Sequence, residues 1–97
     1  MRAVKRIEII IEKPHIPKVR SMLDSLGITS MTIFESVAGF GDRGDRIGSG
    51  VSDAQVMHAL LTTCQPDQID DLSAQLEPLL RRLGGLCLIS DATVIRD

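Results

Sequence analysis

Residues 4–37, VKRIEIIIEKPHIPKVRSMLDSLGITSMTIFESV, decide the fold class, because their apolar residues change from the spacing of a strand to that of a helix and back. In residues 4–12, isoleucines alternate with residues that include glutamates, which predicts a half-buried strand. The apolar residues that follow recur three or four positions apart up to Gly27, so we expect an amphipathic helix that ends at this glycine. Residues 31–37 are rich in Thr, Ile, Phe and Val and predict a second strand.

The second half of the chain repeats this order after a glycine-rich segment. Residues 38–53 contain five of the eight glycines and predict a loop. Residues 54–63 predict a third strand. Residues 66–83 predict a second helix, which Pro78 should kink or split because proline lacks the amide that a helix needs. Residues 86–96 predict the last strand.

The order βαββαβ predicts an α+β fold of the ferredoxin-like type, with an antiparallel sheet and both helices on one of its faces. The opposite face of this sheet is not polar. Leu86 and Leu88 alternate with Cys87 and Ile89, so the last strand is apolar on both sides. Because a sheet that is apolar on both faces needs cover on both, we expect further copies of the chain to cover the open face.

Composition and charge exclude several classes of protein. The net charge of -2, from 11 basic and 13 acidic residues, argues against nucleic acid as a partner. The sequence holds no apolar run long enough to span a membrane. Glu8 and Glu12 interrupt the apolar stretch near the start, so we expect no signal peptide. Cys64 and Cys87 fit neither a disulfide framework nor a zinc motif, which indicates reduced thiols in a cytoplasmic protein.

The glycine-rich segment is the first candidate for a binding site. Gly39, Gly41 and Gly44 spell G-x-G-x-x-G after a strand, but no helix follows, so a dinucleotide-binding fold is not indicated. Glycines let backbone amides approach an anion, and Arg43 and Arg46 could bind phosphate. The alternative is a solvated loop in which neighbouring aspartates neutralise the two arginines.

Other polar residues leave two interpretations open. Gly84 and Gly85 follow two arginines and could meet a phosphate, or they could simply end the helix. Arg96 could be a free surface charge or part of a site. His15 and His58 have no metal-ligand spacing, and no catalytic group can be assembled. We therefore expect a protein without enzymatic activity, resident metal or cofactor.

Several short motifs are spread over almost the whole chain. The stretch Gly27–Thr32 reads GITSMT, and Gly39-Phe40-Gly41 follows it. The others are Lys13-Pro14, Glu35, Pro66-Asp67, Ile69-Asp70 and Val94-Ile95-Arg96. Together these segments resemble PII signal-transduction proteins, in which a GITGMT stretch is followed by a GFG turn at nearly the same spacing.

The resemblance implies a homotrimer whose sheets face its centre, with an adenine-nucleotide site in each cleft between subunits. In this chain, Thr32 and the Gly39-Phe40-Gly41 turn would line the base and the ribose. The contacts implied for the rest of the nucleotide are Thr62, Thr63 and Cys64 to the adenine, Gly84 and Gly85 to the phosphates, and Arg96 to a phosphate from the neighbouring subunit.

The departures from the family's pattern point to a subgroup. The predicted loop is short and the chain has no Tyr, so regulation by uridylylation is not expected. Leu86 stands where a phosphate-binding lysine is expected, which favours AMP or ADP over ATP. A short loop with Arg43 and Arg46 resembles the carboxysome-associated PII proteins and the regulators of bicarbonate transporters. That resemblance implies a single PII-like domain over residues 1–97, with a T-loop at about 39–53.

Bicarbonate, near His58 or the loop arginines, is then expected as a second ligand, and a membrane bicarbonate transporter as the partner. Such a protein would be cytoplasmic and would meet the membrane only through the transporter. The alternative function is a trimeric divalent-metal-binding protein of the ion-tolerance type, which shares the fold and would need His or Cys at the subunit interface. A nucleotide-hydrolysing enzyme is a third hypothesis.

Overall fold

The computed structural model describes residues 1–37, 39–41, 44–46 and 56–96. The larger elements follow the predicted order, and short 3₁₀ turns, Lys13–His15 and Pro66–Gln68, precede the helices. The strands and helices are β1 (Arg2–Glu12), α1 (Ile16–Ser25), β2 (Thr32–Val37), β3 (Gly39–Gly41), β4 (Gly44–Arg46), β5 (Met57–Cys64), α2 (Ile69–Leu83) and β6 (Leu86–Val94).

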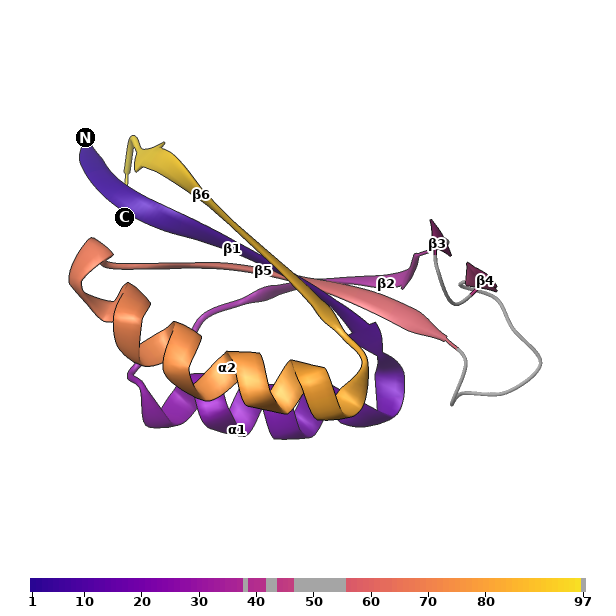
Figure 1. The fold of residues 1–97 in the computed structure, drawn as a ribbon. Helices are drawn as coiled ribbons and strands as arrows, with labels where there is room; N and C mark the ends of the chain where they lie inside the picture. The colour runs from indigo at the N-terminus through magenta and orange to yellow at the C-terminus, as the bar shows by residue number, and fades with distance from the viewer. Residues whose placement is uncertain (38, 42–43, 47–55, 97) are drawn as a thin grey trace.

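The main sheet confirms the predicted ferredoxin-like fold. Its strand order is β2-β5-β1-β6, and each neighbouring pair is antiparallel. Both helices lie on one face of this sheet (Figure 1), as two right-handed crossovers require. β3 and β4 pair with each other in a separate sheet, so the prediction of a plain loop was wrong for these short stretches. Glycine at three of the six positions made a strand look unfavourable there.

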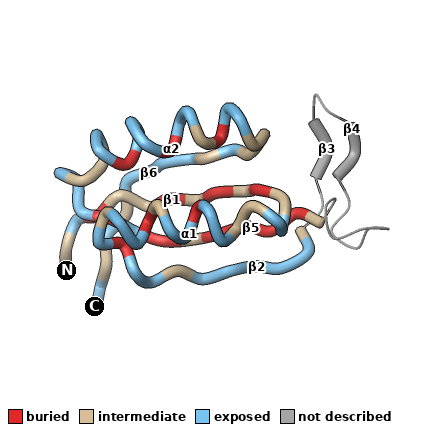
Figure 2. Tube along the Cα trace, turned by 90° about the horizontal axis from the view of Figure 1, so that it is seen from below, coloured by how far each residue is buried: buried red, intermediate tan, exposed pale blue. Residues whose placement is uncertain are grey.

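The core lies between the sheet and the helices. Ile7, Ile9 and Ile11 are fully buried on the helix-facing side of β1, which confirms the alternation in the sequence. Figure 2 shows this burial concentrated on the central strands β1 and β5, whereas the edge strands are mostly exposed. The other buried residues that complete the core include Val19, Leu23, Leu60, Leu72, Leu76 and Leu80.

Both helices end at a glycine in the left-handed conformation or just before one, as predicted. Gly27 has φ +82 and Gly84 has φ +87. Of the two effects expected of Pro78, the split is wrong, because α2 continues through this residue, and the kink stays a prediction. Pro78 and Ala74 are both exposed. Water can therefore reach the Ala74 carbonyl that loses its amide partner, which makes proline tolerable here.

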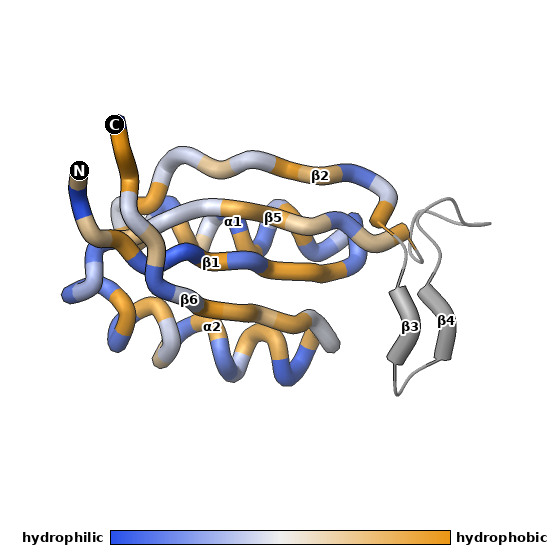
Figure 3. The backbone as a smooth tube through the Cα atoms, turned by 90° about the horizontal axis from the view of Figure 1, so that it is seen from above, coloured by the Kyte–Doolittle hydropathy of each residue, from blue (hydrophilic) through white to orange (hydrophobic). Residues whose placement is uncertain are grey.

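The face of the sheet opposite the helices carries exposed apolar residues, as predicted, beside polar ones such as Glu8. Phe34, Leu86 and Leu88 are 51%, 52% and 51% exposed. Cross-strand pairing aligns one apolar row on this face, made of Phe34, Ala59, Ile10 and Leu86. Figure 3 shows the hydrophobic stretches of these strands side by side. We call Ile10, Phe34, Ala59, Leu86 and Leu88 the open-face patch.

Candidate functional site

A polar hollow of about 230 Å³ lies where β5 ends. Its walls are the segment 27–30, which follows α1, and the segment 62–65, which ends β5. Arg2 and Gln68 also line it. The hollow thus forms between two turns that leave the same end of the sheet, where backbone groups are not all used by strand pairing.

Side-chain hydrogen bonds fix the two walls relative to each other. The Thr62 hydroxyl donates to the Ser30 carbonyl oxygen at 2.6 Å. Gln68 Nε2 donates to the Leu26 carbonyl oxygen at 3.1 Å, while its Oε1 accepts the Gln65 amide at 2.8 Å. Thr62 is 7% exposed and Ser30 is exposed, so the bond between them is part-buried. The hollow is therefore a preformed feature of the chain.

A second hollow of about 310 Å³ adjoins the first along the edge of the sheet. It is lined by residues 30–32 of the β2 side and residues 61–63 of β5. The shared walls bring Thr32, Thr62, Thr63 and Cys64 together at one place, although they come from two separate stretches of sequence. Their contact with a nucleotide stays a prediction.

Gly84 and Gly85 lie elsewhere in the subunit. They precede β6, and β1 and β5 separate β6 from β2 in the sheet. The Gly84 amide donates to the Leu80 carbonyl oxygen at 2.7 Å. This bond supports the interpretation in which Gly84 and Gly85 end the helix. A Cβ atom on Gly85 would come within 2.9 Å of Leu80 Cδ2 and 3.2 Å of the Ile10 carbonyl oxygen. Packing alone therefore explains glycine at this position.

Among the remaining predicted residues, Arg96 is fully described and does not line either hollow within one chain. Arg96 lies beyond β6, which ends at Val94 opposite Arg2. Gly39, Phe40 and Gly41 form β3. β4, the second strand in the glycine-rich segment, ends at Arg46. The structure describes only the backbone of Arg46. Arg43 lies outside the described residues.

The two thiols are poor nucleophiles in this environment. Burial raises the pKa of Cys64, and the nearby Asp67 carboxylate raises it further, against a smaller opposing effect of Lys5. Burial raises the pKa of Cys87 to about 11. The thiolate is the reactive form of cysteine, and a raised pKa favours the neutral thiol. We therefore interpret Cys64 as a packing residue at the wall of the hollow.

The family of nitrogen regulatory protein P-II matches residues 4–97. The chain belongs to the nitrogen regulatory protein P-II family. The resemblance in the sequence motifs is thus confirmed at the level of the family, and the protein is a PII-like signalling protein. No curated protein sequence matches the chain.

Solved structures with the same fold include CPII from Thiomonas intermedia K12, a nitrogen regulatory PII-like protein. CPII bound to ADP, AMP and bicarbonate has a TM-score of 0.88 and 22% identity, over 97% of this chain and 90% of that one. CPII bound to ADP and bicarbonate has a TM-score of 0.85 and 24% identity, over 97% and 90% of the two chains. CPII bound to ADP, AMP and acetate has a TM-score of 0.80 and 20% identity, over 98% and 91%.

Several residues of this P-II hollow were not predicted from the sequence. The segment 27–30 was noticed as part of a motif but not assigned to a site, and Gln65, Gln68 and Arg2 were not singled out. Gln65 and Gln68 flank Pro66-Asp67, which the sequence marked as a helix start. The reciprocal bonding of these two glutamines is a capping box, so their spacing was the available signal.

The metal-binding alternative finds no ligand set in the part of the chain that the structure describes. No group of three His, Cys, Asp or Glu residues gathers there. His58 is 7% exposed, and its Nδ1 accepts the Ser36 amide at 3.1 Å. This buried, engaged imidazole also gives no support for a bicarbonate contact at His58. Within the described residues, no helix is long and apolar enough to cross a membrane.

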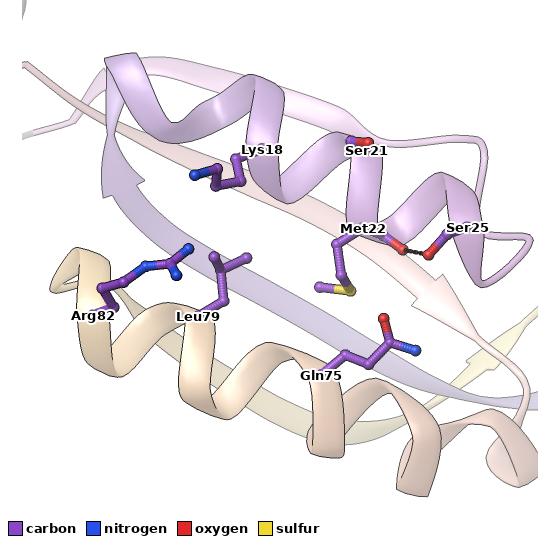
Figure 4. A pocket seen from close by; sticks show the side chains of 7 residues that line it. All are labelled: Lys18, Ser21, Met22, Ser25, Gln75, Leu79 and Arg82. Carbon is purple, nitrogen blue, oxygen red and sulfur yellow. Dashed lines mark hydrogen bonds between the residues drawn. The ribbon is translucent and has the colours of Figure 1, made fainter.

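A further hollow of about 510 Å³ lies between the two helices. Figure 4 shows Met22 of α1 and Leu79 of α2 between the helices, with Lys18 and Arg82 together toward one end. Among the residues whose side chains the structure describes, none of the predicted nucleotide contacts lines this groove. The hollows beside β5 are therefore the better candidate site of this P-II protein.

Proposed function

We propose that this P-II family protein is a non-catalytic sensor that binds AMP or ADP in clefts between the subunits of a homotrimer. It relays energy or inorganic-carbon status to a bicarbonate transporter. The observation that carries the proposal is the preformed hollow that Thr62, Thr63 and Cys64 border, in a chain of this family. These are the residues for which the sequence resemblance implied adenine contacts.

The chemistry of the hollow suits a nucleoside. Its walls offer threonine and serine hydroxyls and backbone groups at strand and helix ends, which can hydrogen-bond a base or a ribose. CPII, which has the same fold, was solved with ADP and AMP. AMP or ADP is preferred over ATP because Leu86 occupies the position of the expected lysine. A neutral side chain there supplies no charge to a third phosphate.

The separation of the predicted contacts supports a site shared between copies of the chain. Thr32 and Thr62 lie beside β2, whereas Gly84 and Gly85 precede the opposite edge strand, β6. One subunit cannot bring both groups to one small ligand. Association through the open-face patch would bury its exposed leucines and let a neighbour supply Gly84, Gly85 and Arg96.

Bicarbonate is the proposed second ligand, supported by the CPII structures that contain it. Arg43 and Arg46 remain the proposed anion contacts of a T-loop at about 39–53. The protein would act in the cytoplasm and reach the membrane only by binding the transporter. Catalysis is not part of the proposal, because neutral thiols and the hydrogen-bonded Thr62 offer no activated nucleophile at the hollow.

Isothermal titration with AMP, ADP, ATP and cyclic AMP, each with and without bicarbonate, tests this function. We expect saturable binding of AMP or ADP at one site per chain, weaker binding of ATP, and an affinity that bicarbonate changes. Absence of binding by every nucleotide would overturn the proposal. A saturable copper or zinc site in the same protein would then favour the ion-tolerance alternative.

A further inference from the structure

β2 leaves regular pairing with β5 before it ends. The register joins Phe34 to Ala59 and then Val37 to Met57, so β2 carries an extra residue between these pairs. Ser36 lies in this bulge with φ +57, and it is the one non-glycine residue with a positive φ in the described part of the chain. A side chain in this left-handed region is sterically disfavoured, so other contacts must hold Ser36 there.

His58 supplies a bond that holds Ser36. Its ring lies on β5 opposite Ile11 and is 7% exposed. His58 Nδ1 accepts the Ser36 amide N–H at 3.1 Å, and the same nitrogen lies 3.0 Å from the Met57 carbonyl oxygen. One nitrogen cannot accept a proton from Ser36 and donate one to Met57. The bond to Ser36 therefore requires a neutral ring that carries its proton on Nε2.

Two side chains of β5 thus fasten β2 at two points. Thr62 bonds the Ser30 carbonyl oxygen just before β2 begins, and His58 bonds the Ser36 amide just before β2 ends. The chain then continues into β3 at residues 39–41. The conformation of Ser36 consequently sets the direction in which the backbone leaves the sheet toward the proposed nucleotide contacts.

The geometry points to His58 as a positioning residue of the nucleotide site. Its neutral imidazole holds Ser36 in the left-handed conformation, and this fixes the approach of Gly39, Phe40 and Gly41 to the nucleotide. The inference rests on the proposed function. His58 acts through Ser36 rather than by touching the ligand, because its ring is buried and its Nδ1 is used by the bulge.

Nitrogen NMR of the histidine rings in the wild-type protein tests the bond without any nucleotide. We expect His58 to show an unprotonated Nδ1 and a protonated Nε2 at neutral pH. The His58→Asn variant removes the signals and so assigns them. A proton on Nδ1 would place the bond on Met57 instead of Ser36 and would overturn the inference.

Three variants then test the effect on ADP binding. His58→Leu removes the acceptor, whereas His58→Asn keeps an oxygen acceptor near the position of Nδ1. The third variant combines His58→Leu with Ser36→Gly, since glycine adopts a positive φ without steric cost. We expect His58→Leu to raise the Kd for ADP by about fivefold, because a fivefold change corresponds to the net free energy of one typical hydrogen bond. His58→Asn and the double variant should stay within about twofold of wild type.

If His58→Leu and His58→Asn weaken ADP binding equally, His58 acts by packing, and the positioning role is overturned. Failure of Ser36→Gly to restore affinity in the Leu background would do the same. The failure of the proposed function looks different. Wild-type protein would then bind no ADP, and the positioning role would fall with it, while the NMR result would still decide whether the bond between Ser36 and His58 exists.

Discussion

Thr62 contributes to the candidate site through one hydroxyl that joins two segments. The sequence predicted Thr62, Thr63 and Cys64 as a group from their place at the end of a strand in a family-like pattern. It did not predict that Thr62 bonds the Ser30 carbonyl or that Ser36 bonds His58. Both bonds depend on which residues of β2 and β5 lie opposite each other. That register includes a bulge, and alternation in the sequence carries no signal for it.

Thr62→Val keeps the shape of the side chain and removes the hydroxyl. The Ser30 carbonyl loses the donor of a part-buried bond, so we expect the free energy of unfolding to fall by about 1 kcal/mol and ADP binding to weaken. Chemical denaturation and titration measure the two effects. Thr93→Val, at an exposed position of β6, is the matched control. A Thr62→Val protein that behaves like this control would contradict the role of the hydroxyl.

Gly85→Ala separates packing from phosphate binding. The added Cβ would meet Leu80 Cδ2 at 2.9 Å and the Ile10 carbonyl oxygen at 3.2 Å. We expect a loss of about 1–3 kcal/mol in unfolding free energy from this overpacking, measured by denaturation. Gly27→Ala is the comparison: nothing lies within 4 Å of its Cβ, but its φ of +82 is unfavourable. Its cost should be about 1 kcal/mol. If Gly85→Ala keeps the stability of the wild type but loses ADP binding, the packing account is contradicted and Gly85 has a binding role only.

The order and type of the main elements could be predicted because each has a clear period and an end signal. The isoleucines of β1 alternate, and Gly27 and Gly84 mark helix ends with left-handed conformations. β3 and β4 could not be predicted, since short glycine-containing strands resemble loops in composition. The effect of Pro78 depends on solvent exposure, which local sequence does not show.

Pro78→Ala tests the account of α2. Alanine would restore an amide donor within a helix that already continues through this position. We expect a gain of about 1 kcal/mol, less than the ~3 kcal/mol usual for proline in a helix interior. The reason is that water can hydrogen-bond the exposed Ala74 carbonyl and that proline also restricts the unfolded chain. Denaturation at one fixed protein concentration measures it, with Gln75→Ala as an exposed control on the same helix. A destabilised Pro78→Ala protein would contradict this account.

For the molecule as a whole, the open-face patch is the feature that a single chain does not explain. Leu86 and Leu88 are half exposed on a face that a soluble monomer would keep polar. The sequence already indicated this face, because alternate positions of the last strand are apolar on both sides. The sequence could not show that the predicted nucleotide contacts lie at two opposite edges of the sheet, because this distribution depends on the strand order.

Leu88→Glu places a charge in the patch, next to Glu8 on the neighbouring strand. We expect this variant to lose the trimer, because burying an unpaired carboxylate opposes association. Light scattering after size exclusion measures the mass. Lys18→Glu, on the helix side of the molecule, changes charge without touching the patch and should stay trimeric. A trimeric Leu88→Glu protein would remove this face from the interface.

Native mass spectrometry of the wild-type protein with ADP tests the central claim most directly, because it reports assembly and ligand together. The account predicts a trimer that takes up one ADP per chain at saturation, with Thr62→Val binding less ADP in the same assembly. A trimer that remains free of ADP, or a monomer that binds it fully, would contradict a nucleotide site built between subunits.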